Sequence, residues 1–234
     1  MQDANLKTYH YFAAGRWHEP ASGHWIDSEN PATGEVWARI PDCNEEDVHR
    51  AVKAARCCYD EGTWGRMQAA ERGRLLTRIG DVIAKNAERL GEVETRDNGK
   101  LPKNITPSLK SWQTESFYYY AGMCDKFEGS LLPTEVPDML NYLRWEPFGV
   151  CALITAWNSP LGVLICKLAP ALAAGNAVVI KPSEHASAST LELMAVLEEA
   201  DLPDGLLNVV TGFGKTTGEP LVDHPEVRMA SFPG

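Results

Sequence analysis

The chain has 234 residues, which is enough for one large domain or two small ones with a proper core. Its composition, 44% hydrophobic and 23% charged, is ordinary for a soluble globular protein. It carries 22 basic against 32 acidic residues, a formal net charge of −10, which repels phosphate groups and excludes nucleic acid and anionic membranes as expected partners.

Residues 1–134 read as short strands followed by helices. Glycine and proline interrupt aromatic and β-branched residues over residues 11–40, which predicts turns and edge strands. Asn44 is a candidate helix N-cap because three carboxylates follow it. Apolar spacing predicts a helix from this cap, a second with Leu75 to Ile83 on one face, and a third over residues 107–123. We interpret the aromatic residues of the third as core or interface.

Residues 135–146 form a separate segment. Leu140, Tyr142 and Arg144 alternate with Asn141, Leu143 and Trp145, which indicates extended strands that pair as an arm. We expect this segment to be an oligomerisation arm, so that a homo-oligomer is one expected form of the protein.

A stretch without charged residues runs from Pro147 to Cys166 and is long enough to span a bilayer. In its middle, Trp157-Asn158-Ser159-Pro160 would place polar groups and a helix breaker at bilayer depth. Two buried elements joined by a turn fit this pattern better, and we expect no membrane insertion.

Residues 147–234 alternate between strand and helix patterns. Apolar runs predict strands at residues 150–154, 177–180, 206–210 and 227–232, and helical spacing occupies residues 161–174, 187–200 and 216–222. This order implies βαβ units with right-handed crossovers and a parallel sheet. The expected fold class is therefore α/β, with N-terminal helices and short strands leading into an incomplete Rossmann-like parallel sheet. Ligands of such sheets bind beyond the carboxyl ends of the strands.

Lys181, Ser183 and Glu184 follow the second of these predicted strands. An acidic side chain at this place can accept hydrogen bonds from ribose hydroxyls. Its negative charge also disfavours a 2′-phosphate, which favours NAD over NADP. The alternative is that Ser183 or Glu184 caps the helix that follows, and the sequence leaves both interpretations open.

Two further strand ends carry patterns that are ambiguous alone. The run from Gly212 to Gly218 contains Gly-Lys-Thr, but an ATP-binding P-loop needs glycine where this chain has Val209. A tight turn at a helix start, where anions often bind, explains this run as well. Asn158 could donate to a developing oxyanion, although asparagine before Ser-Pro is more often a turn residue.

Five segments, taken together, carry a resemblance to a known family. They are Asn30-Pro31-Ala32-Thr33-Gly34-Glu35, Asp97-Asn98-Gly99-Lys100, Ala156-Trp157-Asn158-Ser159-Pro160, the segment from Gly175 to Glu184, and Leu202 to Val210 with the glycine turn after it. In order and spacing they resemble the NAD(P)-dependent aldehyde dehydrogenase superfamily over nearly the whole chain. Residues 147–234 would then be a Rossmann-like NAD-binding segment.

The resemblance implies a role for each candidate residue. Asn158 would be the oxyanion-hole side chain, Lys181 and Glu184 would hold the adenosine ribose with Ser183 beside them, Thr155 would lie near the ribose, Trp157 by the pyrophosphate, and Gly214 and Gly218 on the adenine side. In this family a cysteine thiolate attacks the aldehyde, hydride passes from the resulting adduct to NAD(P), and water activated by a glutamate hydrolyses the thioester to the acid. The resemblance implies no metal.

The chain also departs from the family pattern. Ala156 replaces a proline, Ser159 a phenylalanine and Pro233 a threonine, and the sequence stops at Gly234, before the family's base glutamate and nucleophilic cysteine. None of the six cysteines stands in the nucleophile context. We therefore expect a truncated, cofactor-binding half that binds NAD weakly and is inactive alone.

Two function classes stay open. The leading hypothesis is an aldehyde-oxidising enzyme, and the alternative is a non-catalytic NAD-binding or assembly subunit that pairs with a full-length aldehyde dehydrogenase. The cysteines form no C-x-x-C pair, and the polar N-terminus has no signal-peptide core. Both features indicate a reducing, cytoplasmic setting.

Overall fold

The structure is a computed structural model that describes residues 6–233. Its centre is a six-stranded sheet in the order β11-β8-β9-β10-β2-β3. Four strands follow the expected apolar runs and are mutually parallel: β8 (Val150–Ile154), β9 (Ala177–Lys181), β10 (Leu207–Val209) and β11 (Val227–Ser231). The α/β class and the Rossmann-like parallel sheet predicted from the sequence are confirmed.

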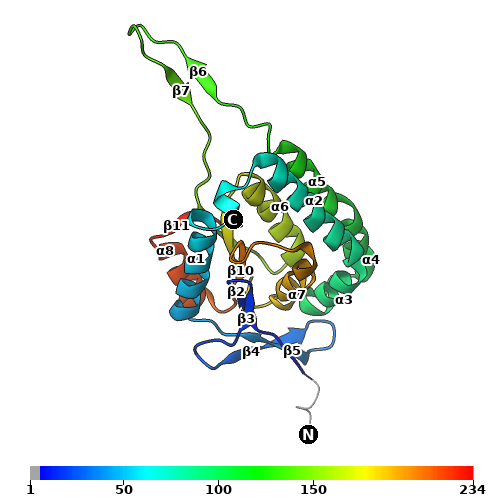
Figure 1. Cartoon of the computed structure of the whole chain (residues 1–234). Helices are drawn as coiled ribbons and strands as arrows, with labels where there is room; N and C mark the ends of the chain where they lie inside the picture. The colour runs from blue at the N-terminus through cyan, green and yellow to red at the C-terminus, as the bar shows by residue number, and fades with distance from the viewer. Residues whose placement is uncertain (1–5, 234) are drawn as a thin grey trace.

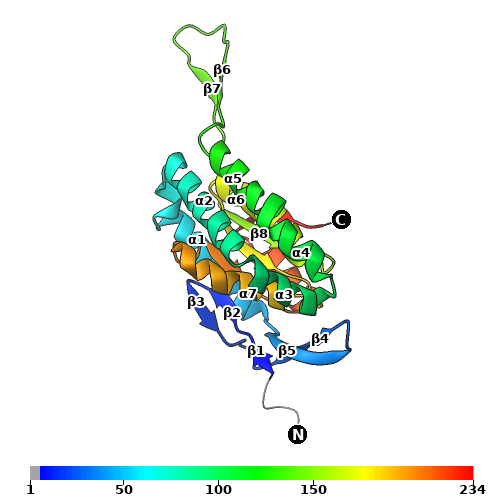
Figure 2. The same ribbon diagram turned by 90° about the vertical axis from the view of Figure 1, so that its right-hand side faces the viewer.

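Helices cover both faces of this sheet (Figure 1). On one face lie α1 (Glu45–Asp60) and the short α8 (Glu219–Asp223). On the other lie α6 (Pro160–Ala173) and α7 (Ala188–Leu197), the latter extended by the 3₁₀ turn Glu198–Ala200. A further layer, α2 (Ala69–Lys85) and α5 (Thr114–Met123), packs on α6 (Figure 2). Because helices cover both faces, β9 is buried at every residue.

The N-terminal strands divide between two sheets. β2 (Tyr11–Ala13) and β3 (Arg16–His18) form a hairpin, and β2 pairs antiparallel with β10. β1 (Lys7–Thr8), β4 (Trp25–Asn30) and β5 (Glu35–Pro41) make a separate three-stranded sheet. Nothing in the sequence pattern indicates that the hairpin extends the main sheet, because strands of three residues carry almost no register signal.

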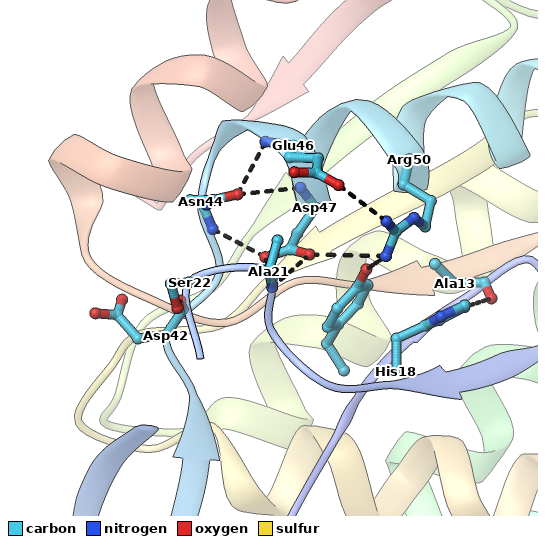
Figure 3. Close-up of polar contacts among 10 residues, drawn as sticks. Ala13, His18, Ala21, Ser22, Asp42, Asn44, Glu46, Asp47 and Arg50 are labelled. Atoms are coloured by element: carbon cyan, nitrogen blue, oxygen red, sulfur yellow. Dashed lines mark hydrogen bonds and ion pairs between the residues drawn. The ribbon is translucent and has the colours of Figure 1, made fainter. Parts of the chain in front are cut away.

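Asn44 is the N-cap of α1, as the sequence predicts. Its side chain accepts from the backbone N–H of Glu46 and Asp47 at 3.0 and 3.4 Å, and Asp47 accepts in return from the backbone N–H of Asn44 at 3.1 Å. Asp47 is fully buried and also accepts from the N–H of Ala21 at 3.1 Å (Figure 3). This carboxylate therefore fixes the start of α1 to the N-terminal strand region.

The prediction of a single helix over residues 107–123 is wrong. The chain forms α4 (Pro102–Ser108), a π-helical turn (Leu109–Gln113) and then α5, and Ser111 leaves the helical conformation at φ −120° and ψ −110°. The hydroxyl of Ser111 donates to the carbonyl of Pro107 at 2.8 Å, and that of Thr114 donates to the carbonyl of Leu109 at 2.5 Å. These side chains compete with the backbone hydrogen bonds and divide the helix.

Helix α3 (Ala87–Asn98) was not predicted from the sequence. Its buried face includes the ionisable residues Glu94 and Asp97 beside Leu90, so it shows a weak apolar stripe. It ends at Gly99, which adopts the left-handed conformation at φ 77°.

A two-stranded hairpin projects from the body of the molecule (Figures 1 and 2). It pairs β6 (Ser130–Leu132) with β7 (Asn141–Leu143), so it starts before the expected arm segment 135–146. Its apolar side chains are exposed, with Leu131 at 71%, Leu140 at 70% and Trp145 at 76%. Over residues 6–233, no helix combines the length and the apolar character that crossing a membrane requires.

Candidate cofactor site

A cleft of about 590 Å³ lies at the carboxyl ends of the parallel strands. Its lining comprises Ile154, Thr155, Ala156, Trp157, Lys181, Ser183, Glu184, Gly214, Gly218, Glu219, Val222, Asp223, Phe232 and Pro233. All seven residues expected to bind the cofactor are among them, although they come from three separate strand ends. Asn158 is not among them. The structure thus brings the expected binding residues together and leaves the expected oxyanion donor outside the cleft.

Lys181 and Glu184 form a charged pair on the floor and wall of the cleft. Lys181 ends β9 and is only 4% exposed, while Glu184 is partly exposed. The ammonium Nζ donates to the carbonyl of Pro182 at 3.0 Å and lies 3.7 Å from Oε2 of Glu184. Burial lowers the pKa of Lys181, and the Glu184 carboxylate partly opposes this effect. The pair offers a donor and an acceptor at one point, as recognition of adjacent hydroxyl groups requires.

The alternative role for Ser183 and Glu184, capping of helix α7, is wrong. Ser187 is the N-cap of α7, and its side chain makes no capping hydrogen bond. The carboxylate of Asp97 takes this role, since its Oδ2 accepts from the backbone N–H of Ser189 at 2.8 Å and from the Ser189 hydroxyl at 2.7 Å. Ser183 and Glu184 do not cap α7, and both line the cleft.

Thr155 and Trp157 form the wall that follows β8. The backbone N–H of Thr155 donates to the carbonyl of Lys181 at 3.1 Å, which joins the two strand ends. The Thr155 hydroxyl is buried without a hydrogen-bond partner among the described residues. Trp157 is 58% exposed. An unsatisfied buried hydroxyl beside an exposed indole fits a polar ligand with a flat portion.

The glycine run opens α8 through a π-helical turn, Gly214–Gly218. A Cβ at Gly212 would lie 2.2 Å from Oγ1 of Thr217, and this glycine has φ 138°, so only glycine fits. Thr217 is fully buried and donates to the carbonyl of Cys43 at 2.6 Å. A Cβ at Gly218 would lie 3.5 Å from Cδ and Cε of Lys181, an ordinary contact distance, so Gly218 lies directly beside the Lys181 side chain.

Asn158 lies on an exposed turn two residues before the start of α6. The next residue, Ser159, accepts a hydrogen bond from Nζ of Lys100 at 2.9 Å. Pro233, which departs from the family pattern, lines the cleft with Phe232. The turn that carries Asn158 is therefore anchored through Ser159, at the position where the family pattern has phenylalanine.

Comparison with known proteins agrees with this architecture. The model of the aldehyde dehydrogenase family matches residues 17–234. The chain belongs to the aldehyde dehydrogenase family. It is 42% identical over 229 residues to (Z)-2-((N-methylformamido)methylene)-5-hydroxybutyrolactone dehydrogenase of Acinetobacter baylyi, covering 98% of this chain and 46% of that protein. It is 40% identical to the human mitochondrial aldehyde dehydrogenase, and the match covers 95% of this chain and 43% of that protein.

A solved structure gives the same result. The NAD+ complex of aldehyde dehydrogenase from Bacillus cereus superposes with a TM-score of 0.94 at 36% identity, covering 99% of this chain and 47% of that one. The chain spans about half the length of the curated relatives it matches.

The cysteines of this aldehyde dehydrogenase chain do not line the cleft. Four are buried, and burial raises the pKa of Cys43 and Cys58 to about 12 and that of Cys151 to about 11. Cys57 and Cys166 are exposed. A raised pKa keeps a thiol protonated and therefore weakly nucleophilic. Among residues 6–233 no cluster of three or more His, Cys, Asp and Glu side chains could hold a metal ion.

Three lining residues of α8 were missed by the sequence reasoning. Glu219, Val222 and Asp223 face the cleft from this short helix. Their spacing of three and four residues places them on one helical face, which was the available signal.

Proposed function

We propose that this chain is the dinucleotide-binding part of an NAD+-dependent aldehyde dehydrogenase that oxidises an aldehyde to a carboxylic acid. The observation that carries the proposal is the convergence of seven expected cofactor-binding residues on one cleft at the sheet edge where dinucleotides bind. The structurally similar Bacillus cereus aldehyde dehydrogenase is described as an NAD+ complex, which supports the same cofactor.

The residues of the cleft suit the parts of NAD+. We infer that Lys181 and Glu184 hold the adenosine ribose, with Ser183 beside them, because a buried ammonium and a partly exposed carboxylate lie 3.7 Å apart there. Thr155 would contribute its unsatisfied hydroxyl, and Trp157 its exposed indole beside the pyrophosphate.

The glycine turn would accept the adenine. Gly214 and Gly218 carry no side chain that could fill this part of the cleft, and Val222 provides apolar surface next to them. Glu184 would also disfavour a 2′-phosphate through charge repulsion, so we propose NAD+ rather than NADP+ as the cofactor.

Bound NAD+ would supply the hydride acceptor for aldehyde oxidation. Asn158 would donate its side-chain N–H to the aldehyde oxygen as negative charge develops there. Because no cysteine lines the cleft, we propose that these 234 residues alone do not oxidise aldehydes. The free cysteines also fit a reducing compartment such as the cytoplasm.

A thermal-shift comparison of NAD+, NADP+ and ATP tests the cofactor assignment. We expect NAD+ to raise the melting temperature most, because only a ligand that binds the folded state stabilises it. A larger shift with ATP, or none with NAD+, would reject the proposal. Mixing the chain with NAD+ and acetaldehyde should give no absorbance from NADH; a turnover abolished by removing one cysteine would overturn the assignment of the cysteines.

The exposed hairpin favours a second candidate function, an assembly role. Leu131, Tyr142 and Trp145 on this hairpin are each at least 62% exposed, which is characteristic of a surface that another protein covers. Sedimentation of the wild-type chain and of the Leu131→Lys, Tyr142→Lys double variant tests this role. Loss of a dimer or larger oligomer in the variant supports it, and a monomeric wild-type chain that does not bind an intact relative rejects it.

A further inference from the structure

The Asp97–Lys100 turn has no role in the proposed chemistry, yet it reaches two loops of the cleft. It ends α3: Asn98 is the last helical residue, and Gly99 follows in the left-handed conformation. A Cβ at Gly99 would lie 2.9 Å from Cγ of Pro31, so glycine is required by space as well as by its φ of 77°. The side chain of Asn98 accepts from the backbone N–H of Lys100 at 2.9 Å and so fixes the direction of the turn.

One end of this turn holds the start of α7. The carboxylate of Asp97, 2% exposed, accepts from both the backbone N–H and the hydroxyl of Ser189. Ser189 lies in the first turn of α7, the helix that follows the Lys181–Glu184 segment. The position of this segment is therefore coupled to α3.

The other end holds the start of α6. Lys100 donates from Nζ to Oγ of Ser159 at 2.9 Å, and Ser159 is the N-cap residue of α6 although its own side chain makes no capping hydrogen bond. Gly162 leaves room for this contact, because a Cβ there would lie 2.6 Å from Oγ of Ser159. Trp157 and Asn158 directly precede this anchored serine.

We propose that Asp97 and Lys100 are positioning residues, which fix the starts of α6 and α7 relative to each other and so set the shape of the cleft between the loops after β8 and β9. The proposal rests on the proposed NAD+ site for its functional consequence. Lys100 is the more informative of the two, since it is only partly buried and holds the loop that carries Trp157 and Asn158.

Fluorine NMR of the chain labelled with 5-fluorotryptophan tests the positioning without any ligand. The Lys100→Met variant should shift or broaden the Trp157 signal, assigned with Trp157→Phe. Trp64 is the internal control, because it is 1% exposed and donates to the carbonyl of Gly175, outside the cleft lining. Lys100→Arg should largely restore the wild-type spectrum, and Lys103→Met, at an exposed lysine of α4, should not change it. An unchanged Trp157 signal in Lys100→Met would overturn the proposal.

Titration with NAD+ tests the consequence for binding. Lys100→Met and Ser159→Ala should each weaken NAD+ binding about five- to tenfold, less than the full loss of a charge-assisted hydrogen bond because the contact acts on the ligand only through the loop, and the double variant should be no weaker than either. Additive losses would show that the contact does not carry the effect and would contradict the proposal. If the wild-type chain does not bind NAD+, the proposed function fails, while the fluorine spectra still decide the positioning role.

Discussion

Nε2 of His224 donates a hydrogen bond to Nδ1 of His49 at 3.1 Å. A backbone hydrogen bond to the other ring nitrogen of His224 identifies His224 as the donor. The N–H of Glu226 donates to Nδ1 of His224 at 3.2 Å, so Nδ1 carries no proton and the neutral ring holds its proton on Nε2. The bond joins α1 to the residue that follows α8, the helix that lines the cleft through Val222 and Asp223. The arrangement requires His224 to be neutral.

Acidification should therefore weaken the attachment of α8. Burial, the neighbouring His49 and Lys53 hold the pKa of His224 below its usual value, while Glu226 opposes them. The unfolded chain then binds this proton more readily than the folded chain. The stabilisation is complete above the ordinary histidine pKa of about 6.5 and is lost as pH falls through the lowered value. Urea titrations at pH values from 7.5 to 5 measure the free energy of unfolding. As pH falls, this free energy should decrease less in His224→Gln than in the wild type; an equal decrease with pH in both proteins would refute this account.

Glu94 should produce the opposite dependence on pH. It is 1% exposed, its Oε2 has no hydrogen-bond partner among the described residues, and burial raises its pKa to about 7 against the attraction of Lys100. A raised carboxyl pKa means that stability falls as pH rises from about 4.5 to about 7, by roughly 1–3 kcal/mol. Burial also raises the pKa of Asp97 to about 6, which adds to the fall, so Glu94→Gln should reduce the fall, whereas Glu92→Gln, at an exposed position of the same helix, should keep it in full. Guanidinium unfolding at pH 5 and 8 measures both.

Removing the carboxylate of Asp97 should destabilise the fold. Asp97→Ala leaves the N–H and hydroxyl of Ser189 without their partner in a buried place, at a cost of about 2 kcal/mol. Ser183→Ala is the matched control, because Ser183 does not cap α7, and its free energy of unfolding should stay within about 0.5 kcal/mol of the wild type. A larger loss in Ser183→Ala than in Asp97→Ala would restore the capping role of Ser183.

The choice between NAD+ and NADP+ should depend on Glu184. Replacing it with glutamine removes the negative charge that repels a 2′-phosphate and keeps hydrogen-bonding capacity. Lys181 is buried 3.7 Å away and is then no longer neutralised, which should favour the phosphate further. Isothermal titration should show the ratio of NADP+ to NAD+ affinity rising at least about tenfold in Glu184→Gln. Glu219→Gln also removes a carboxylate from the cleft lining and should change this ratio less.

The sequence was sufficient to predict the four parallel strands and the sheet edge where the cleft lies. The apolar runs that became β8, β9, β10 and β11 were long enough to identify, and the polar residues at their ends meet because parallel strands end at one edge. Asn44 was predicted as an N-cap because that signal is local.

What the sequence could not predict depends on distant contacts. The Asp97–Ser189 hydrogen bond joins residues 92 positions apart, and β2 of the β2–β3 hairpin pairs with β10 although almost the whole chain separates them in sequence. Neither contact leaves a periodic pattern. The division of the helix at Ser111 depends on hydroxyl groups whose competition with the backbone becomes apparent only in three dimensions.

The measurement that tests the central claim most directly is calorimetric titration of NAD+ into the wild-type chain and into Lys181→Met. Lys181 is the most deeply buried charged group of the cleft, and methionine keeps most of its volume. We predict saturable binding of one NAD+ per chain that weakens at least about tenfold in the variant, as expected for loss of a charged hydrogen-bond donor. Equal affinity in both proteins, or no binding by the wild type, would contradict the assignment of this cleft to the dinucleotide.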